Sequence, residues 1–235
     1  MLIKGLANYF LKNYYDAIEY FEKAHLTLSV LTLVNIQNEY YSSFAEIYRL
    51  KGEAFINLKN SEKAIENLQV ALELSYDSLN TASIYYNLGI VKSTLQNNPS
   101  EAIKFYSLAI NNYPANANKE KSEAFYNRGI NYRKIEKPNE AIKDYTSAIK
   151  IRTDYIKAYN NRAVAKISIE DYKGAIADCN QVIKLDNGQT ENTGMAYYNR
   201  GLAKLSIDDI KGCDDIKKAK SLGQSVSQEI LNLCK

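Results

Sequence analysis

The chain has little proline, glycine, cysteine or histidine, and no tryptophan. Its 235 residues include only 3 prolines and 10 glycines, too few for the many tight turns of a β-sandwich or barrel. Hydrophobic residues make up 46% and charged residues 24%, which is ordinary for a folded protein and argues against disorder. The composition therefore favours a helical fold.

Long apolar runs and an excess of charge of one sign are also absent. No stretch reaches the roughly 18 apolar residues of a membrane helix, so no membrane span is expected. The formal net charge is +3, from 30 basic and 27 acidic residues. This balance does not indicate the concentrated basic surface with which proteins bind nucleic acids. The first residues lack a secretory signal pattern and run directly into a helical pattern, which favours a cytoplasmic location.

Residue types that carry catalysis or bind metals are sparse. His25 is the single histidine, and there is no Cys-x-x-Cys pair and no glycine-rich phosphate loop. Cys179, Cys213 and Cys234 stand at unrelated spacings, which predicts reduced and mostly buried thiols. Nothing assembles into a nucleophile–base pair. We expect no enzyme, no cofactor and no metal site.

What the sequence does contain is an internal repeat. The segment 141–149 closely resembles 175–183, and the same pattern recurs at 17–24, 64–71 and 102–109. Each copy has small, large and small residues separated by four and then three positions, which places them on one helical face. Upstream of these segments lies a further small residue, in most units 12 positions earlier: Gly5, Gly52, Gly89, Gly129, Ala163 and Gly201.

The recurring small residues predict close helix packing. A glycine inside a helix costs about 1 kcal/mol relative to alanine, so its recurrence at a fixed phase argues for a packing reason. We expect two helices to approach closely there, with the large residue filling the gap beside them. Between Gly89 and Ala102 the interval is 13, and we place the extra residue in the loop 96–99. Lysines at Lys92, Lys166 and Lys204 are expected to lay their stems over the seam while their ammonium groups reach water.

This arrangement resembles the tetratricopeptide repeat, a helix–turn–helix of about 34 residues. The resemblance covers nearly the whole chain and implies an all-α, right-handed superhelical solenoid of antiparallel helix pairs, with 1–235 as a single domain. The family's aromatic residue, often tryptophan, is here Tyr48, Tyr85, Phe125, Tyr159 and Tyr197. The expected units are approximately 1–37, 39–75, 79–112, 119–152, 156–186 and 194–222, with a capping helix at 226–234.

Two irregular intervals between the recurring small residues lead to further predictions. The 47 residues from Gly5 to Gly52 predict a long second helix, roughly 14–37, that turns near Asn38. The apolar run 26–34 within it covers too wide a face for a simple surface helix. The polar segment 112–118 is expected to be a flexible joint between two repeats.

The resemblance places the first helix of each repeat on a concave surface, where asparagines recur in phase in four consecutive units. Asparagine is a poor helix former whose amide both donates and accepts hydrogen bonds, so a row of them can pair with an extended peptide. The alternative is that each asparagine bonds a neighbouring repeat. The predicted peptide-binding residues are Tyr86, Asn87, Tyr126, Asn127, Ile130, Lys157, Asn160, Asn161, Tyr198 and Asn199.

Basic residues lie beside this stripe. For Arg128, Arg162 and Arg200, each directly after one of the asparagines, a structural role between helices is favoured over ligand binding. Arg133 and Lys134 are better candidates for binding an acidic ligand residue, although the end of a helix is usually solvated.

The expected function is a non-catalytic module that binds an extended peptide or partner segment in the concave groove. Some members of the family capture the acidic tails of heat-shock chaperones, but here Tyr86, Ile90 and Asn161 stand where that clamp needs other residues. The alternative is a structural or self-assembly scaffold, a homo-oligomer that forms through the long N-terminal helix or the solenoid ends. RNA binding is disfavoured, because the period is irregular and no basic groove is seen.

Overall fold

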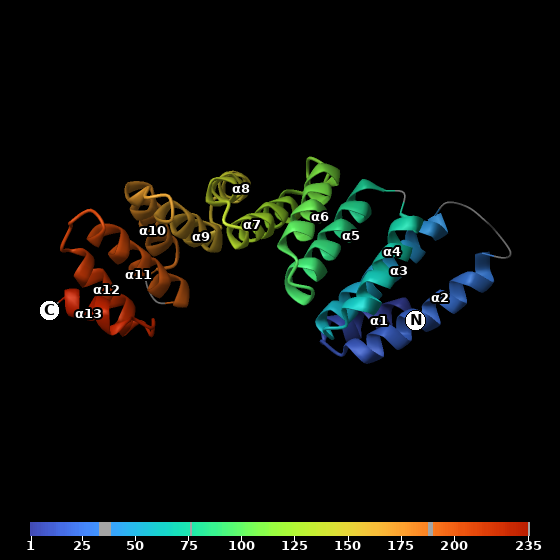
Figure 1. Ribbon diagram of the computed structural model, residues 1–235. Coiled ribbons are helices and arrows are strands. Elements are labelled where there is room, and N and C mark those ends of the chain that lie inside the picture. Colours follow the sequence, from blue (N-terminus) through green and yellow to red (C-terminus); the bar gives the residue numbers. More distant parts are fainter. Residues whose placement is uncertain (33–38, 76, 188–189, 235) are drawn as a thin grey trace. The chain divides into compact units, whose positions relative to one another are not determined.

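In the computed structural model, which describes residues 1–32, 39–75, 77–187 and 190–234, the chain folds as helices joined by short loops (Figure 1). No β-strand occurs in these ranges, and successive helices pack as antiparallel pairs. The all-α class is therefore confirmed. Residues 1–124 and 125–235 form two compact units. A single solenoid over the whole chain stays a prediction.

The first unit contains three helix pairs and the start of a fourth. N-cap side chains begin several of its helices: Asn60 accepts a hydrogen bond from the Lys63 amide and Asn98 from the Glu101 amide. The elements are α1 (Leu2–Phe10), α2 (Tyr14–Thr32), α3 (Glu39–Asn57), α4 (Ser61–Leu74), α5 (Ser78–Ile90), the π-helical η1 (Val91–Leu95), α6 (Pro99–Asn112) and the beginning of α7 (Asn118–Lys134).

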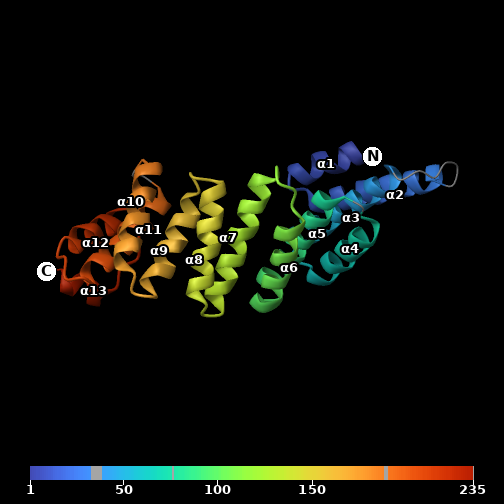
Figure 2. The same ribbon diagram turned by 90° about the horizontal axis from the view of Figure 1, so that it is seen from above.

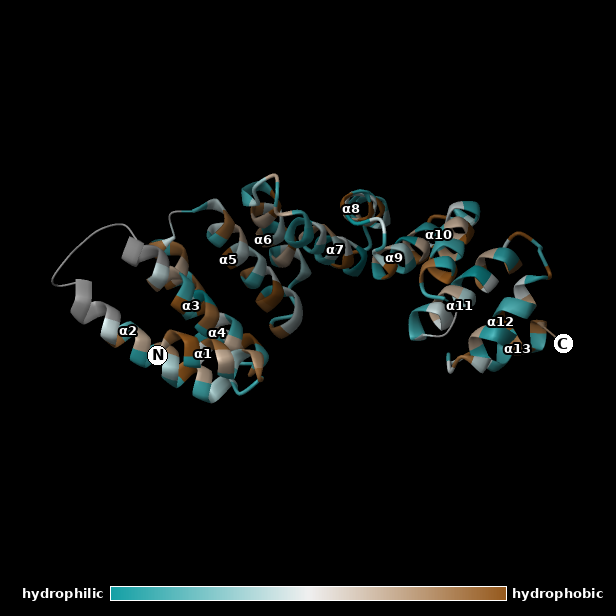
Figure 3. Ribbon diagram, turned by 180° about the vertical axis from the view of Figure 1, so that it is seen from behind, coloured by the Kyte–Doolittle hydropathy of each residue, from teal (hydrophilic) through white to brown (hydrophobic). Residues whose placement is uncertain are grey.

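The second unit continues the alternation and ends in a short helix (Figure 2). Its elements are the remainder of α7, α8 (Pro138–Ile151), α9 (Ile156–Ile167), α10 (Tyr172–Leu185), α11 (Glu191–Leu205), α12 (Gly212–Ser221) and α13 (Gln228–Leu233). Every helix carries hydrophobic and hydrophilic stretches, as helices with one buried face do (Figure 3).

The turn inside each helix pair contains a residue with a left-handed backbone conformation, and none of these residues is glycine. The φ angle is +60° at Lys12, +59° at Lys59, +46° at Asn97, +56° at Glu136, +62° at Glu170 and +60° at Asp208. Left-handed residues after a helix satisfy its last carbonyl groups, and glycine is usual there. Lysine and glutamate, which hold four of these positions, do not signal a left-handed turn, so this shared geometry could not be predicted from the sequence.

The expected pairing of small and large residues is confirmed. A Cβ atom added to Gly129 would lie 2.7 Å from the ring of Tyr145, and one added to Gly89 would lie 2.7 Å from the ring of Tyr106. The one unit with alanine at this position, Ala163, has the smaller Cys179 in the same core cluster. In the remaining units the glycine faces Phe21, Leu68 or Ile216.

Three expectations need correction or limitation. The extra residue between Gly89 and Ala102 lies in η1, because a π-helical turn holds one residue more than an α-helical turn; it does not lie in the loop 96–99. The segment 112–118 is anchored, since Tyr113 is only 5% exposed. Helix α2 is described as far as Thr32, and its expected continuation to 37 lies outside the described residues.

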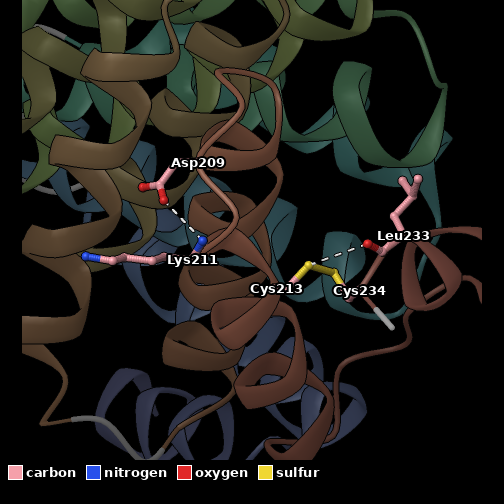
Figure 4. Close-up of a disulfide and its surroundings, with 5 residues drawn as sticks. All are labelled: Asp209, Lys211, Cys213, Leu233 and Cys234. Atoms are coloured by element: carbon pink, nitrogen blue, oxygen red, sulfur yellow. Dashed lines mark hydrogen bonds between the residues drawn. A yellow bond between two sulfur atoms is a disulfide. The ribbon is translucent and has the colours of Figure 1, made fainter.

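The expectation of reduced thiols is wrong for two cysteines. Cys213, in the first turn of α12, forms a disulfide with Cys234, which directly follows α13 (Figure 4). Val226 and Ile230 pack onto the same cluster, so the expected capping helix closes the end of the second unit. Cys179 is a free and buried thiol, as expected. The expected cytoplasmic location stays a prediction.

Candidate functional site

Two of the predicted peptide-binding residues, Tyr86 and Asn87, lie on α5 in the first unit. Asn87 is 5% exposed, and its Nδ2 donates a hydrogen bond of 2.7 Å to Glu53 Oε1 on α3 of the preceding repeat. The Tyr86 ring packs against Tyr106, with centroids 5.7 Å apart. For Asn87, the alternative of a bond between repeats is therefore realised.

The second unit contains the other eight predicted residues. Asn161 Nδ2 donates to the Tyr126 hydroxyl at 3.1 Å, while Asn161 Oδ1 accepts from Arg133 at 2.7 Å. Asn160 is 2% exposed and donates to the Asn192 carbonyl at 3.0 Å. These amides also join neighbouring repeats, and Arg133, expected to face an acidic ligand, is engaged with one of them.

The remaining predicted residues differ in exposure. Lys157 is exposed, whereas Asn199 is buried and its Nδ2 has no hydrogen-bond partner among the described residues. Asn127, Ile130 and Tyr198 are half-buried. The structure thus places the stripe on the first helices of successive pairs, and its role in peptide contact stays a prediction.

The structural role of the arginines is confirmed. Arg162 donates two hydrogen bonds to Asp178, which joins α9 to α10, and Lys166 Nζ lies 2.9 Å from the same carboxylate. Arg200 and Lys204 hold Asp215 in the same way. The ammonium groups of Lys166 and Lys204 therefore form partly buried ion pairs with an aspartate on the facing helix.

A polar groove that sequence analysis missed lies between α3 and α5 in the first unit. Glu53 is its central residue: it accepts hydrogen bonds from Asn87 and from the Tyr9 hydroxyl, the latter at 2.9 Å, and pairs with Arg49. Arg49 also donates to both oxygens of Glu46. Burial, followed by the charge of Glu53, raises the pKa of Tyr9, so this phenol stays protonated.

Two adjoining cavities form this groove, and they share Arg49 and Ser83. One, of about 320 Å³, is lined by Glu46, Arg49, Asp77, Leu79, Asn80 and Ser83. The other, of about 200 Å³, is lined by Arg49, Glu53, Ser83, Tyr86, Asn87, Tyr113, Glu120 and Glu123. Predicted and unpredicted site residues thus meet in one place. The charged ones were not among the predicted peptide-binding residues.

A separate cavity of about 380 Å³ lies in the second unit. Arg133, Glu136, Pro138, Val164 and Ser168 line it. Arg133 is the residue that bonds Asn161, so this cavity adjoins the predicted stripe. Its lining mixes charged, hydroxyl and apolar side chains.

The described ranges contain no group of three or more histidine, cysteine, aspartate or glutamate side chains placed to hold a metal ion. Within the same ranges, none of the helices is both long enough and apolar enough to cross a membrane.

Comparison with known families decides the class of the repeat. Models described as "Tetratricopeptide repeat" match residues 43–115, 122–155 and 156–189, which together are more than half of the chain. The chain belongs to the tetratricopeptide repeat family. The number of repeats is not fixed by these matches, because they leave both ends of the chain uncovered.

Curated relatives match over part of their length. Human DnaJ homolog subfamily C member 7 is 30% identical over 140 residues, which cover 56% of this chain and 27% of the relative. Its Schizosaccharomyces pombe homolog is 26% identical over 145 residues, covering 58% and 30%. Human serine/threonine-protein phosphatase 5 is 36% identical over 85 residues, covering 36% and 16%. The chain spans less than a third of the length of these relatives.

Solved structures share the fold at low identity. YrrB, titled a TPR protein with an unusual peptide-binding site, superposes with a TM-score of 0.68 at 20% identity, covering 88% of this chain and 96% of that one. BtubC from P. vanneervenii gives 0.70 at 16% identity, covering 89% and 95%. The family is one of protein-interaction repeats, and the matches indicate no catalytic family.

Proposed function

We propose that the chain is a non-catalytic interaction module that binds an extended segment of a partner protein along the first helices of its repeats. The observation that carries this proposal is the groove between α3 and α5, in which Tyr86 and Asn87 line the same cavity as the charged residues around Glu53.

The chemistry of the groove suits recognition rather than reaction. Its walls offer amide, hydroxyl and carboxylate groups on rigid helices, which can pair with the backbone and side chains of an extended peptide. Its charged groups at Arg49 and Glu53 are held in hydrogen bonds with each other. YrrB, a TPR protein with an unusual peptide-binding site, has the same fold, and this supports the proposal by analogy.

Peptide selection tests the proposal. A random decapeptide library is panned against the wild type, and the selected peptides are measured by fluorescence anisotropy against Tyr86→Ala. We expect binding to weaken about tenfold, as for loss of an aromatic contact residue. Tyr15→Ala, at a tyrosine 75% exposed on α2, is the matched control and should bind as the wild type does. A library that yields no binder, or folded Tyr86→Ala that binds unchanged, would contradict the proposal.

Self-assembly is a second candidate, favoured by the exposed apolar residues of the first repeat. Ile3 is 82% exposed and Phe10 76%, and Ala7 between them is also exposed. The equivalents of Ala7 in later units, Ala165 and Ala203, are covered by side chains of the repeat before them. A helix pair from a second copy of the chain can cover Ala7 in the same way. Sedimentation equilibrium should show concentration-dependent association that Ile3→Ser/Phe10→Ser removes; a monomer at all concentrations would exclude it.

A further inference from the structure

The geometry points to a basic segment, a stretch of chain that carries lysine or arginine side chains, as the partner of the groove between α3 and α5. This inference rests on the proposed function and names the chemistry of its ligand.

The two cavities form a continuous track because one face of each helix lines both. Glu46, Arg49 and Glu53 follow each other on α3 at intervals of three and four residues, and so do Asn80, Ser83 and Asn87 on α5. Seven helical residues rise about 10 Å, the length of about three residues of extended chain. The track therefore holds a short extended segment lying along the helices.

The charge of the track is strongly unbalanced. Among the residues lining the two cavities, Arg49 is the one basic side chain and five residues are carboxylates. Arg49 is already held by Glu46 and Glu53, and its side chain is only 16% exposed. It serves to bring two carboxylates together and offers little to an anion. The carboxylates are Glu46, Glu53, Asp77, Glu120 and Glu123.

Uncharged groups in the track also favour a cation. Tyr86 and Tyr113 line the second cavity, and aromatic rings receive both the apolar stem and the charged end of lysine or arginine. Burial raises the pKa of Tyr113 to about 12, and the charges of Glu120 and Glu123 add to the shift. This tyrosine therefore remains neutral beside an incoming cation.

A metal ion is not the cation that this arrangement fits. No group of three or more carboxylate, histidine or cysteine side chains in the described ranges converges on one point. The carboxylates are instead spread along the track. Two lie on α3, one is at the N-cap of α5, and two lie on α7. Charges spaced along a track match the successive side chains of a peptide.

The experiment compares three fluorescein-labelled decapeptides that alternate serine with lysine, glutamine or glutamate, each measured by anisotropy at low and high salt. The lysine peptide should bind the wild type, more weakly as salt rises, and the other two should bind at least about tenfold more weakly. The variant Glu120→Gln/Glu123→Gln should weaken lysine-peptide binding about five- to tenfold. Glu62→Gln/Glu66→Gln, which removes the same charge from exposed positions on α4, is the matched control and should change it less than twofold.

Distinct outcomes separate this inference from the proposed function. Equal binding of the three peptides, or equal weakening by the groove variant and by its α4 control, would overturn the choice of a basic partner. If glutamine peptides bind and Tyr86→Ala abolishes that binding, the groove still binds peptides and only the charge preference fails. If no library peptide binds at all, the proposed function itself fails. Glu120→Gln alone, at an exposed residue, keeps the test valid should the double variant unfold.

Discussion

Arg162 on α9 holds Asp178 on α10 through two hydrogen bonds, from Nε at 2.9 Å and from Nη2 at 2.6 Å. Lys166 Nζ also lies 2.9 Å from Asp178 Oδ2. The same geometry joins α11 to α12, but α7 has Tyr132 in place of the lysine. Among the described residues, Arg128 is therefore the one cation paired with Asp144.

The sites differ in the pKa of their aspartate. Burial raises the pKa of Asp144, and Arg128 alone does not offset it. At Asp215, burial acts in the same direction, but Arg200 and Lys204 outweigh it and the pKa lies below its ordinary value. Asp144 is thus the aspartate whose burial its cation does not compensate.

Removing the arginine should therefore cost more at one site than at the other. Arg128→Ala leaves Asp144 buried without a cation, which destabilises by about 3–5 kcal/mol. Arg162→Ala leaves Asp178 with Lys166, and we expect a loss of about 1–3 kcal/mol. Urea unfolding of both variants measures the difference. A loss at Arg162 equal to or larger than that at Arg128 would show that the lysine does not compensate.

The pairing of small and large residues makes a second prediction, for Gly129 and Tyr145. A Cβ atom at position 129 would meet the Tyr145 ring at 2.7 Å, so Gly129→Ala should destabilise by about 1–3 kcal/mol despite the better helix propensity of alanine. The double variant Gly129→Ala/Tyr145→Cys copies Ala163 and Cys179. It should be more stable than the sum of the two single changes predicts, as measured by a thermodynamic cycle.

Much of the fold was predictable because this packing leaves a periodic trace in the sequence. Glycines and alanines at fixed phase, with a large residue facing them, locate both helices of each pair. The position of the π-helical η1 could not be predicted, because a single inserted residue can be accommodated in a loop as well as in a helix. The non-glycine turns at Lys12 and Glu170 were missed because such residues adopt left-handed conformations only where the packing of the helix pair requires it.

The candidate site was less predictable than the fold. Periodicity located Tyr86 and Asn87, but it could not show that Asn87 turns to Glu53 of the preceding repeat. Charged residues such as Glu46 and Glu120 are far apart in sequence. Only the packing of α3, α5 and α7 brings them to one groove.

His25 makes the third prediction, a dependence of stability on pH. Burial, with a further contribution from Lys51, lowers the pKa of His25 below its ordinary value of about 6.5. Between the two pKa values the unfolded chain binds more protons, so stability rises with pH and falls as the pH drops through this window. Thermal unfolding between pH 7.5 and 5.5 should show a lower midpoint in acid. The variant His25→Phe, which keeps ring contacts with Phe44 and Tyr48, should show a smaller change.

The cysteines make the last prediction, a count of reactive thiols in three states. Burial raises the pKa of Cys179 to about 12, so at pH 8 this thiol is neutral as well as covered, and it should not react with Ellman's reagent in the folded protein. Unfolding in guanidinium without reductant should expose one thiol, because Cys213 and Cys234 remain joined. Reduction before the assay should raise the count to three, since the sequence contains 3 cysteines. Three thiols on unfolding without reductant would show that the disulfide is absent from the purified protein. One thiol in the folded state would show that the core around Cys179 opens to solvent.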